Sequence, residues 1–107
     1  MKINIMKESI PYITEITIAG ITFQFEFTYN SYDKRVYITL YDIEDNLIYA
    51  NEPILFGIPL WFNKLVDEKG NFNKKYPQKY IIPNTLDRKA VKIDYENIDK
   101  IELLVEE

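Results

Sequence analysis

Two segments of the chain alternate strictly between apolar and polar side chains. In residues 21–29 the aromatic residues fall on one face and Thr, Gln and Glu fall on the other, and residues 36–41 repeat the pattern with Val, Ile and Leu. Period-two alternation rich in aromatic and β-branched residues predicts half-buried strands. The polar residues 30–34 between them predict a hairpin turn. The side chains that this pattern places in the core are Ile16, Ile18, Phe23, Phe25, Phe27, Val36, Ile38 and Leu40.

Shorter patterns extend this hairpin into a meander. Residues 12–19 alternate in the same way and meet residue 21 through Ala19-Gly20, where glycine accommodates the positive φ of a tight hairpin. A polar turn at 43–46 leads to an apolar segment at 47–50. We therefore predict four antiparallel strands between residues 12 and 50. Further strands are expected at residues 2–6, around 80–82, at 90–93 and at 101–105.

One connecting segment differs from the rest of the chain in composition. Residues 53–62 combine two prolines and one glycine with large apolar side chains, and proline cannot donate to a central ladder. We interpret this segment as an apolar loop, and residues 61–66 fit either a short strand or a helical turn. The predicted fold is all-β and mainly antiparallel, with little helix. It is a small β-sandwich or a partly open barrel that forms one domain over residues 1–107.

Composition narrows the classes of function. The 107 residues are 47% apolar with a net charge of −4, so the chain is long and apolar enough for one core and lacks the positive field that attracts phosphate. We expect neither a nucleic-acid nor a membrane partner. The chain has no His and no Cys, which removes the commonest general base, metal ligand and thiolate nucleophile. We expect no catalytic residues, no metal site and no cofactor.

Two polar clusters resemble ligand-binding sites in composition, one a calcium loop and the other a nucleic-acid platform, but neither has the full pattern of such a site. The acidic turn at residues 42–46 lacks the glycine and the distal Glu of a calcium loop, which favours a solvated hairpin turn. Residues 74–80 interleave lysine and tyrosine, as single-strand nucleic-acid platforms do. Because that segment is short and the chain is acidic, we favour a charged strand edge.

The apolar loop provides the candidate interface. Exposed aromatic residues typically mark protein–protein contacts, and an isolated domain of this size does not readily bury so many large side chains in one loop. The alternative is that the loop closes one end of the sandwich or barrel. The candidate interface residues are Phe56, Ile58, Leu60, Trp61 and Phe62.

The order of these features resembles the small baseplate plug proteins of contractile phage tails and tail-like particles. The resemblance rests on the Phe-rich strand after a Gly turn, the second alternating strand, the acidic turn, the Pro/Gly apolar loop and two late apolar strands. These correspond to residues 21–29, 36–42, 44–46, 53–60, 79–83 and 98–105. The chain departs from the pattern in having a single glycine between residues 67 and 76, and Asn46 where a glycine would close the acidic turn.

The resemblance implies a structural subunit without catalysis that packs against the central hub in the virion tail baseplate. Its implied partners are other baseplate proteins: the hub, the spike or tube initiator, and the wedge. Assembly is expected in the host cytoplasm, and the polar residues Lys7, Glu8 and Ser9 argue against a signal peptide. The alternative function is a stand-alone β-sandwich module that binds carbohydrate or a peptide.

Overall fold

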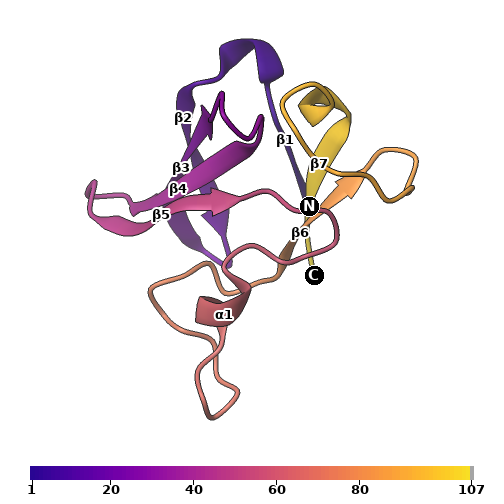
Figure 1. Cartoon of the computed structure of the whole chain (residues 1–107). Coiled ribbons are helices and arrows are strands. Elements are labelled where there is room, and N and C mark those ends of the chain that lie inside the picture. Colours follow the sequence, from indigo (N-terminus) through magenta and orange to yellow (C-terminus); the bar gives the residue numbers. More distant parts are fainter. Residues whose placement is uncertain (107) are drawn as a thin grey trace.

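The computed structural model describes residues 1–106. Strands make up 42% of the chain and helices 9%, which confirms the prediction of an antiparallel β protein with little helix. Figure 1 shows the arrangement of the elements. In chain order they are β1 (Lys2–Asn4), η1 (Lys7–Ser9), β2 (Tyr12–Ile18), β3 (Ile21–Tyr29), β4 (Val36–Asp42), β5 (Leu47–Pro53), α1 (Phe62–Leu65), β6 (Ile81–Thr85), η2 (Ile98–Lys100) and β7 (Ile101–Val105).

The predicted meander forms the larger sheet, in the order β2-β3-β4-β5 with every neighbouring pair antiparallel. β2 and β3 meet at a two-residue turn in which Ala19 has φ 52° and Gly20 has φ 81°. Two positive φ values define a type I′ turn, whose twist matches that of the flanking strands. At the centre of the sheet Phe25 lies opposite Thr14 on β2 and Leu40 on β4. The prediction of four strands is confirmed.

The smaller sheet has the order β1-β7-β6. Lys2 lies opposite Leu104, so the first and last strands run side by side and bring the two ends of the described chain together (Figure 1). The expected early and closing strands are both present, and the strand expected around 80–82 spans residues 81–85.

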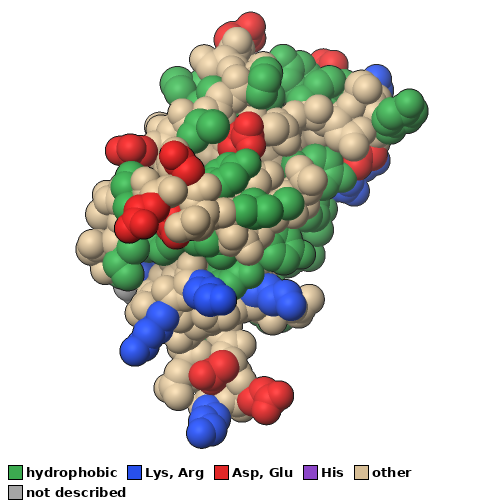
Figure 2. Space-filling model, turned by 90° about the vertical axis from the view of Figure 1, so that its left-hand side faces the viewer, with side chains coloured by type: hydrophobic (Ala, Val, Ile, Leu, Met, Phe, Trp, Pro, Cys, Tyr) green, Lys and Arg blue, Asp and Glu red, His purple; other side chains and the backbone are tan. Residues whose placement is uncertain are grey.

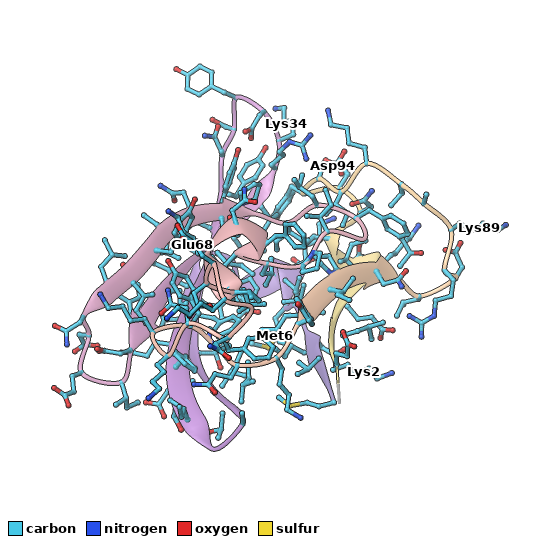
Figure 3. All side chains as sticks on the ribbon, turned by 90° about the horizontal axis from the view of Figure 1, so that it is seen from below. Lys2, Met6, Lys34, Glu68, Lys89 and Asp94 are labelled. Carbon is cyan, nitrogen blue, oxygen red and sulfur yellow. The ribbon has the colours of Figure 1, made fainter. Side chains whose placement is uncertain are left out.

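The strand predicted at residues 90–93 does not form. These residues belong to the long loop between β6 and β7, and Figure 3 shows Lys89 on this loop, directed away from the sheets. Local hydrogen bonds occupy its carbonyls: the Thr85 hydroxyl donates to the carbonyl of Lys89 at 2.9 Å, and the Asn97 amide donates to that of Lys92 at 2.9 Å. Within residues 1–106 the short alternation at 90–93 has no neighbouring strand to pair with.

Both sheets contribute to one hydrophobic core. All eight side chains that the alternation placed in the core are buried, and they join Ile3, Ile81 and Leu103 from the smaller sheet in one cluster. The Tyr12 ring stacks on Phe27 with centroids 4.9 Å apart. Within residues 1–106 the two sheets stay separate, one of four strands and one of three, and no closed barrel forms.

Candidate protein interface

The apolar loop between β5 and α1 is fixed to the smaller sheet through its backbone. The amide of Gly57 donates to the carbonyl of Pro83 at 2.9 Å, and the amide of Leu60 donates to that of Ile81 at 2.9 Å. Both acceptors lie on β6, which is one of the two edge strands of its sheet. Because unpaired edge groups favour aggregation, this loop protects an edge as well as connecting two elements.

Trp61 ends the loop and begins α1. Its backbone is left-handed, with φ 56° and ψ 33°, which costs a residue with a Cβ about 1–2 kcal/mol. The buried indole offsets this cost: the ring is edge-on to Phe25 at 5.6 Å and lies 6.3 Å from Tyr76. The carbonyl of Trp61 accepts the amides of Lys64 and Leu65 at 2.8 and 2.9 Å. The ambiguous residues 61–66 thus contain one helical turn, and Val66 then forms an isolated bridge with Phe72.

Glu52 on β5 supports this geometry. The backbone amide of Trp61 donates to Glu52 Oε2 at 2.6 Å, so a half-buried carboxylate satisfies the amide of a buried residue. Desolvation by burial raises the pKa of Glu52 above its usual 4.5, and the hydrogen bond from Trp61 opposes part of this rise. The folded protein therefore disfavours the ionised form of Glu52 relative to the unfolded chain.

We expect the stability difference between wild type and Glu52→Gln to depend on pH. A carboxyl whose folded pKa is raised contributes stability that is fully present below its unfolded pKa and is lost as pH rises through the folded value. Gln keeps a carbonyl acceptor for Trp61 and cannot ionise, so Glu52→Gln should gain stability relative to wild type from pH 4 to pH 7. Urea unfolding at both values measures this.

Glu52→Ala provides the control for the hydrogen bond. It removes the acceptor and leaves a buried amide unpaired, which should cost about 1–3 kcal/mol at both pH values. A stability of Glu52→Gln relative to wild type that is the same at pH 4 and pH 7, or lower at pH 7, would contradict the raised pKa.

The five candidate interface residues divide into three groups by exposure. Leu60 and Trp61 are only 1% and 2% exposed and lie in the core of the folded chain, because the loop turns inward to cover β6 and Phe25. Phe56 is partly buried against the core. Ile58 and Phe62 are 49% and 58% exposed. The latter three side chains, Phe56, Ile58 and Phe62, are hereafter called the loop patch.

The outer face of the larger sheet is the second surface to consider. It carries acids from β2, β3 and the turn at residues 43–46, together with the exposed apolar residues Ile13 and Leu47. Figure 2, seen from the side of this sheet, shows acidic and apolar side chains mixed over the sheet and basic side chains below them. The Tyr41 hydroxyl donates to Glu26 at 3.2 Å, so part of the polar surface is already paired within the chain.

The acidic turn is a solvated hairpin, as predicted. Asp42 Oδ1 accepts the amides of Glu44 and Asn46, both at 2.9 Å, and Asp45 takes a positive φ of 68°. Hydrogen bonds from Asn46 lower the pKa of Asp42. The carboxylate of Asp42 is therefore engaged in closing the turn.

The lysine- and tyrosine-rich segment at residues 74–80 presents no stacking platform. Tyr76 is buried beside Trp61, and Tyr80 packs against Phe72 with centroids 5.7 Å apart. The segment is also irregular, so the charged strand edge favoured from sequence does not form. Its aromatic residues serve the packing of this end of the molecule.

An open hollow of about 510 Å³ lies between the β3–β4 turn and β5. It is lined by tyrosine and asparagine, including Tyr29, Tyr37 and Asn51, as carbohydrate sites often are. Tyr32 on its rim is 97% exposed and packs against nothing that would hold a sugar ring in place. The hollow therefore offers little enclosure.

Among residues 1–106, no group of three or more His, Cys, Asp or Glu side chains converges as metal ligands would. No helix in the same range is long and apolar enough to cross a membrane. The fold and loop together define the class: a small antiparallel β protein of two sheets that directs apolar side chains outward from one connecting loop.

The comparison with family models identifies the chain more closely. The model described as cyanophage baseplate Pam3 plug gp18 matches residues 1–105, and the chain therefore belongs to this family of phage baseplate plugs. The resemblance inferred from the order of strands and turns is confirmed. Membership implies association with other baseplate proteins and a place in the virion tail. No curated protein matches the chain.

Proposed function

We propose that the chain is a non-catalytic structural subunit of a contractile phage tail or tail-like particle, packed against the central hub of the baseplate. The observation that carries this proposal is the family match over residues 1–105. The sequence supports it, because a chain without His or Cys lacks the groups that most often carry catalysis and bind metals. Its partners are the hub, the spike or tube initiator, and the wedge, with no nucleic acid, membrane or cofactor. It assembles into the baseplate in the host cytoplasm.

The loop patch is the part of the proposed interface that the geometry supports best. Its backbone is fixed by hydrogen bonds to β6, and the neighbouring Trp61 is locked in the core. Ile58 and Phe62 are therefore apolar side chains held outward on a rigid support. Preorganised apolar anchors of this kind bind at a lower entropic cost than mobile ones. A partner surface that covers them removes apolar area from water.

The test replaces these anchors without disturbing the core. Ile58→Lys and Phe62→Lys should unfold within a few degrees of wild type, because both side chains are about half exposed. Loss of an anchor worth about 2 kcal/mol lowers binding about 30-fold. Particles purified from a strain that lacks the wild-type gene and expresses each tagged variant should then contain little of it by quantitative mass spectrometry.

Leu86→Lys is the matched control, since Leu86 is 62% exposed on the loop that follows β6. It should enter particles at the wild-type level. Wild-type incorporation of both Ile58→Lys and Phe62→Lys would remove the loop patch from the proposed interface. Absence of the wild-type protein from purified particles would contradict the proposed function itself.

A further inference from the structure

The two sheets have four edge strands, and three of them are blocked. β1 has three residues, and the loop at residues 57–60 covers β6 through two backbone hydrogen bonds. β5 has register shifts opposite Leu40, a positive φ of 57° at Asn51, and ends at Pro53. Short length, cover, bulges and proline are the usual devices that prevent a strand from adding to an edge.

β2 is the exception. It has seven residues, pairs with β3 at every position from Tyr12 to Ile18 without a register shift, and has β3 as its only strand neighbour in residues 1–106. In that range no loop forms a backbone hydrogen bond with it. A straight, regular edge of this length is a template for strand addition.

The turn geometry determines which backbone groups of β2 are free. In a two-residue type I′ hairpin the flanking residues, here Ile18 and Ile21, form a hydrogen-bonded pair. Antiparallel ladders alternate hydrogen-bonded and non-hydrogen-bonded pairs, so the amides and carbonyls of Ile13, Glu15 and Thr17 point away from β3. The Thr17 and Thr22 hydroxyls meet at 2.7 Å, as expected for the closer, non-hydrogen-bonded pairs.

The negative charge of Glu15 on β2 favours an added strand that carries positive charge. Glu15 is exposed, and within residues 1–106 its side chain makes no ion pair or hydrogen bond. Its cross-strand neighbour Gln24 donates instead to Asp45 at 2.6 Å, and Glu26 lies opposite Ile13. An added strand with Lys or Arg facing Glu15 would pair with it, since opposite charges across a strand pair stabilise a sheet.

We propose that the β2 edge receives an extended, basic segment of another baseplate chain, which becomes a fifth strand of the larger sheet. This inference rests on the proposed function. A second copy of this chain fits less well, because two β2 strands in fully overlapping antiparallel register place Glu15 opposite Glu15, and like charges directly opposite are destabilising.

The test distinguishes the contribution of the β2 backbone to binding from that of the Glu15 side chain. Glu15→Pro removes one outward amide at an edge position, where proline is tolerated, whereas Glu15→Gln keeps the amide and removes only the charge. Glu15→Pro should unfold near the wild-type temperature and enter particles at least tenfold less than wild type. Glu15→Gln should enter at an intermediate level. Particles that contain wild type and Glu15→Pro equally overturn the β2 proposal and leave the proposed function standing.

Amide hydrogen exchange measured on the wild-type protein tests the same proposal without a substitution that could disturb folding. The peptide covering residues 12–18 should exchange more slowly in purified particles than in the isolated protein, whereas a peptide covering residues 86–92 should not change as much. Equal exchange of residues 12–18 in both states overturns the proposal. A concentration-dependent dimer of the isolated protein that Glu15→Pro abolishes overturns it as well, in favour of a second copy. Absence of wild-type protein from particles overturns this proposal and the proposed function together.

Discussion

Phe25→Ala should lower the free energy of unfolding by about 3–5 kcal/mol, the range for removing a fully buried aromatic ring. Phe25 is completely buried at the centre of β3, between Thr14 and Leu40 on the neighbouring strands, and its ring contacts Trp61. Domains are commonly stable by only about 5–15 kcal/mol, so this change removes a large share of the total. Trp61 is the only tryptophan, and its fluorescence during urea unfolding reports directly on this contact.

Thr28→Ala on the opposite face of the same strand is the control. Its side chain points outward and is half buried, so the variant should differ from wild type by no more than about 1 kcal/mol. A loss below about 1 kcal/mol for Phe25→Ala would mean that the register is shifted by one residue, since such a slip exchanges the two faces of a strand.

Trp61→Ala should destabilise the protein by a similar amount, about 3–5 kcal/mol. This is the opposite of the behaviour of a surface anchor, whose removal affects binding and leaves the fold intact. The indole fills the space between Phe25 and Tyr76, and its removal leaves a cavity beneath the apolar loop. Unfolding followed by circular dichroism measures the change, because the variant has no tryptophan.

Trp61→Phe separates packing from polarity at the same position. The indole Nε1 is buried and has no hydrogen-bond partner among residues 1–106, so replacement by phenylalanine breaks no hydrogen bond there and removes an unsatisfied donor. We expect a cost of no more than about 2 kcal/mol, from the smaller ring alone. A cost equal to that of Trp61→Ala would show that the indole nitrogen contributes a stabilising interaction.

The larger sheet could be predicted because the sequence patterns that specify it lie within or next to its own strands. Alternation in β3 and β4 specifies which side chains face the core, and Ala19-Gly20 specifies the turn that joins β2 to β3. Each signal lies within about ten residues of its consequence, and all eight predicted core residues are buried. The order of these local signals also sufficed to indicate the family.

The apolar loop was harder to interpret because its exposure depends on distant contacts. Trp61 is buried by Phe25 and Tyr76, 36 residues before it and 15 residues after it by the numbering. Neither contact leaves a periodic signal in residues 53–62. The division of the loop into buried Leu60 and Trp61 and exposed Ile58 and Phe62 follows from the way its backbone bonds to β6.

The burial of Glu102 in the smaller sheet likewise depends on contacts that are distant in the sequence. The residue interrupts an apolar strand, and alternation alone would place an acid on the solvent side. It does lie on the outer face, opposite Asn4 and Asn84, yet it is only 3% exposed. Its carboxylate forms two ion pairs, each at 3.4 Å, with Lys2 on β1 and with Arg88 on the loop after β6. No local pattern could have indicated those partners.

A reconstruction of the assembled particle by electron cryomicroscopy tests the central claim most directly. The account predicts density for this two-sheet domain in the baseplate, in contact with the hub and with neighbouring chains over the loop patch. Particles from a strain lacking the gene provide the difference map, in which only that density should be missing together with any part that depends on it. A complete baseplate with no density for this domain in wild-type particles would contradict the assignment of the chain as a structural subunit.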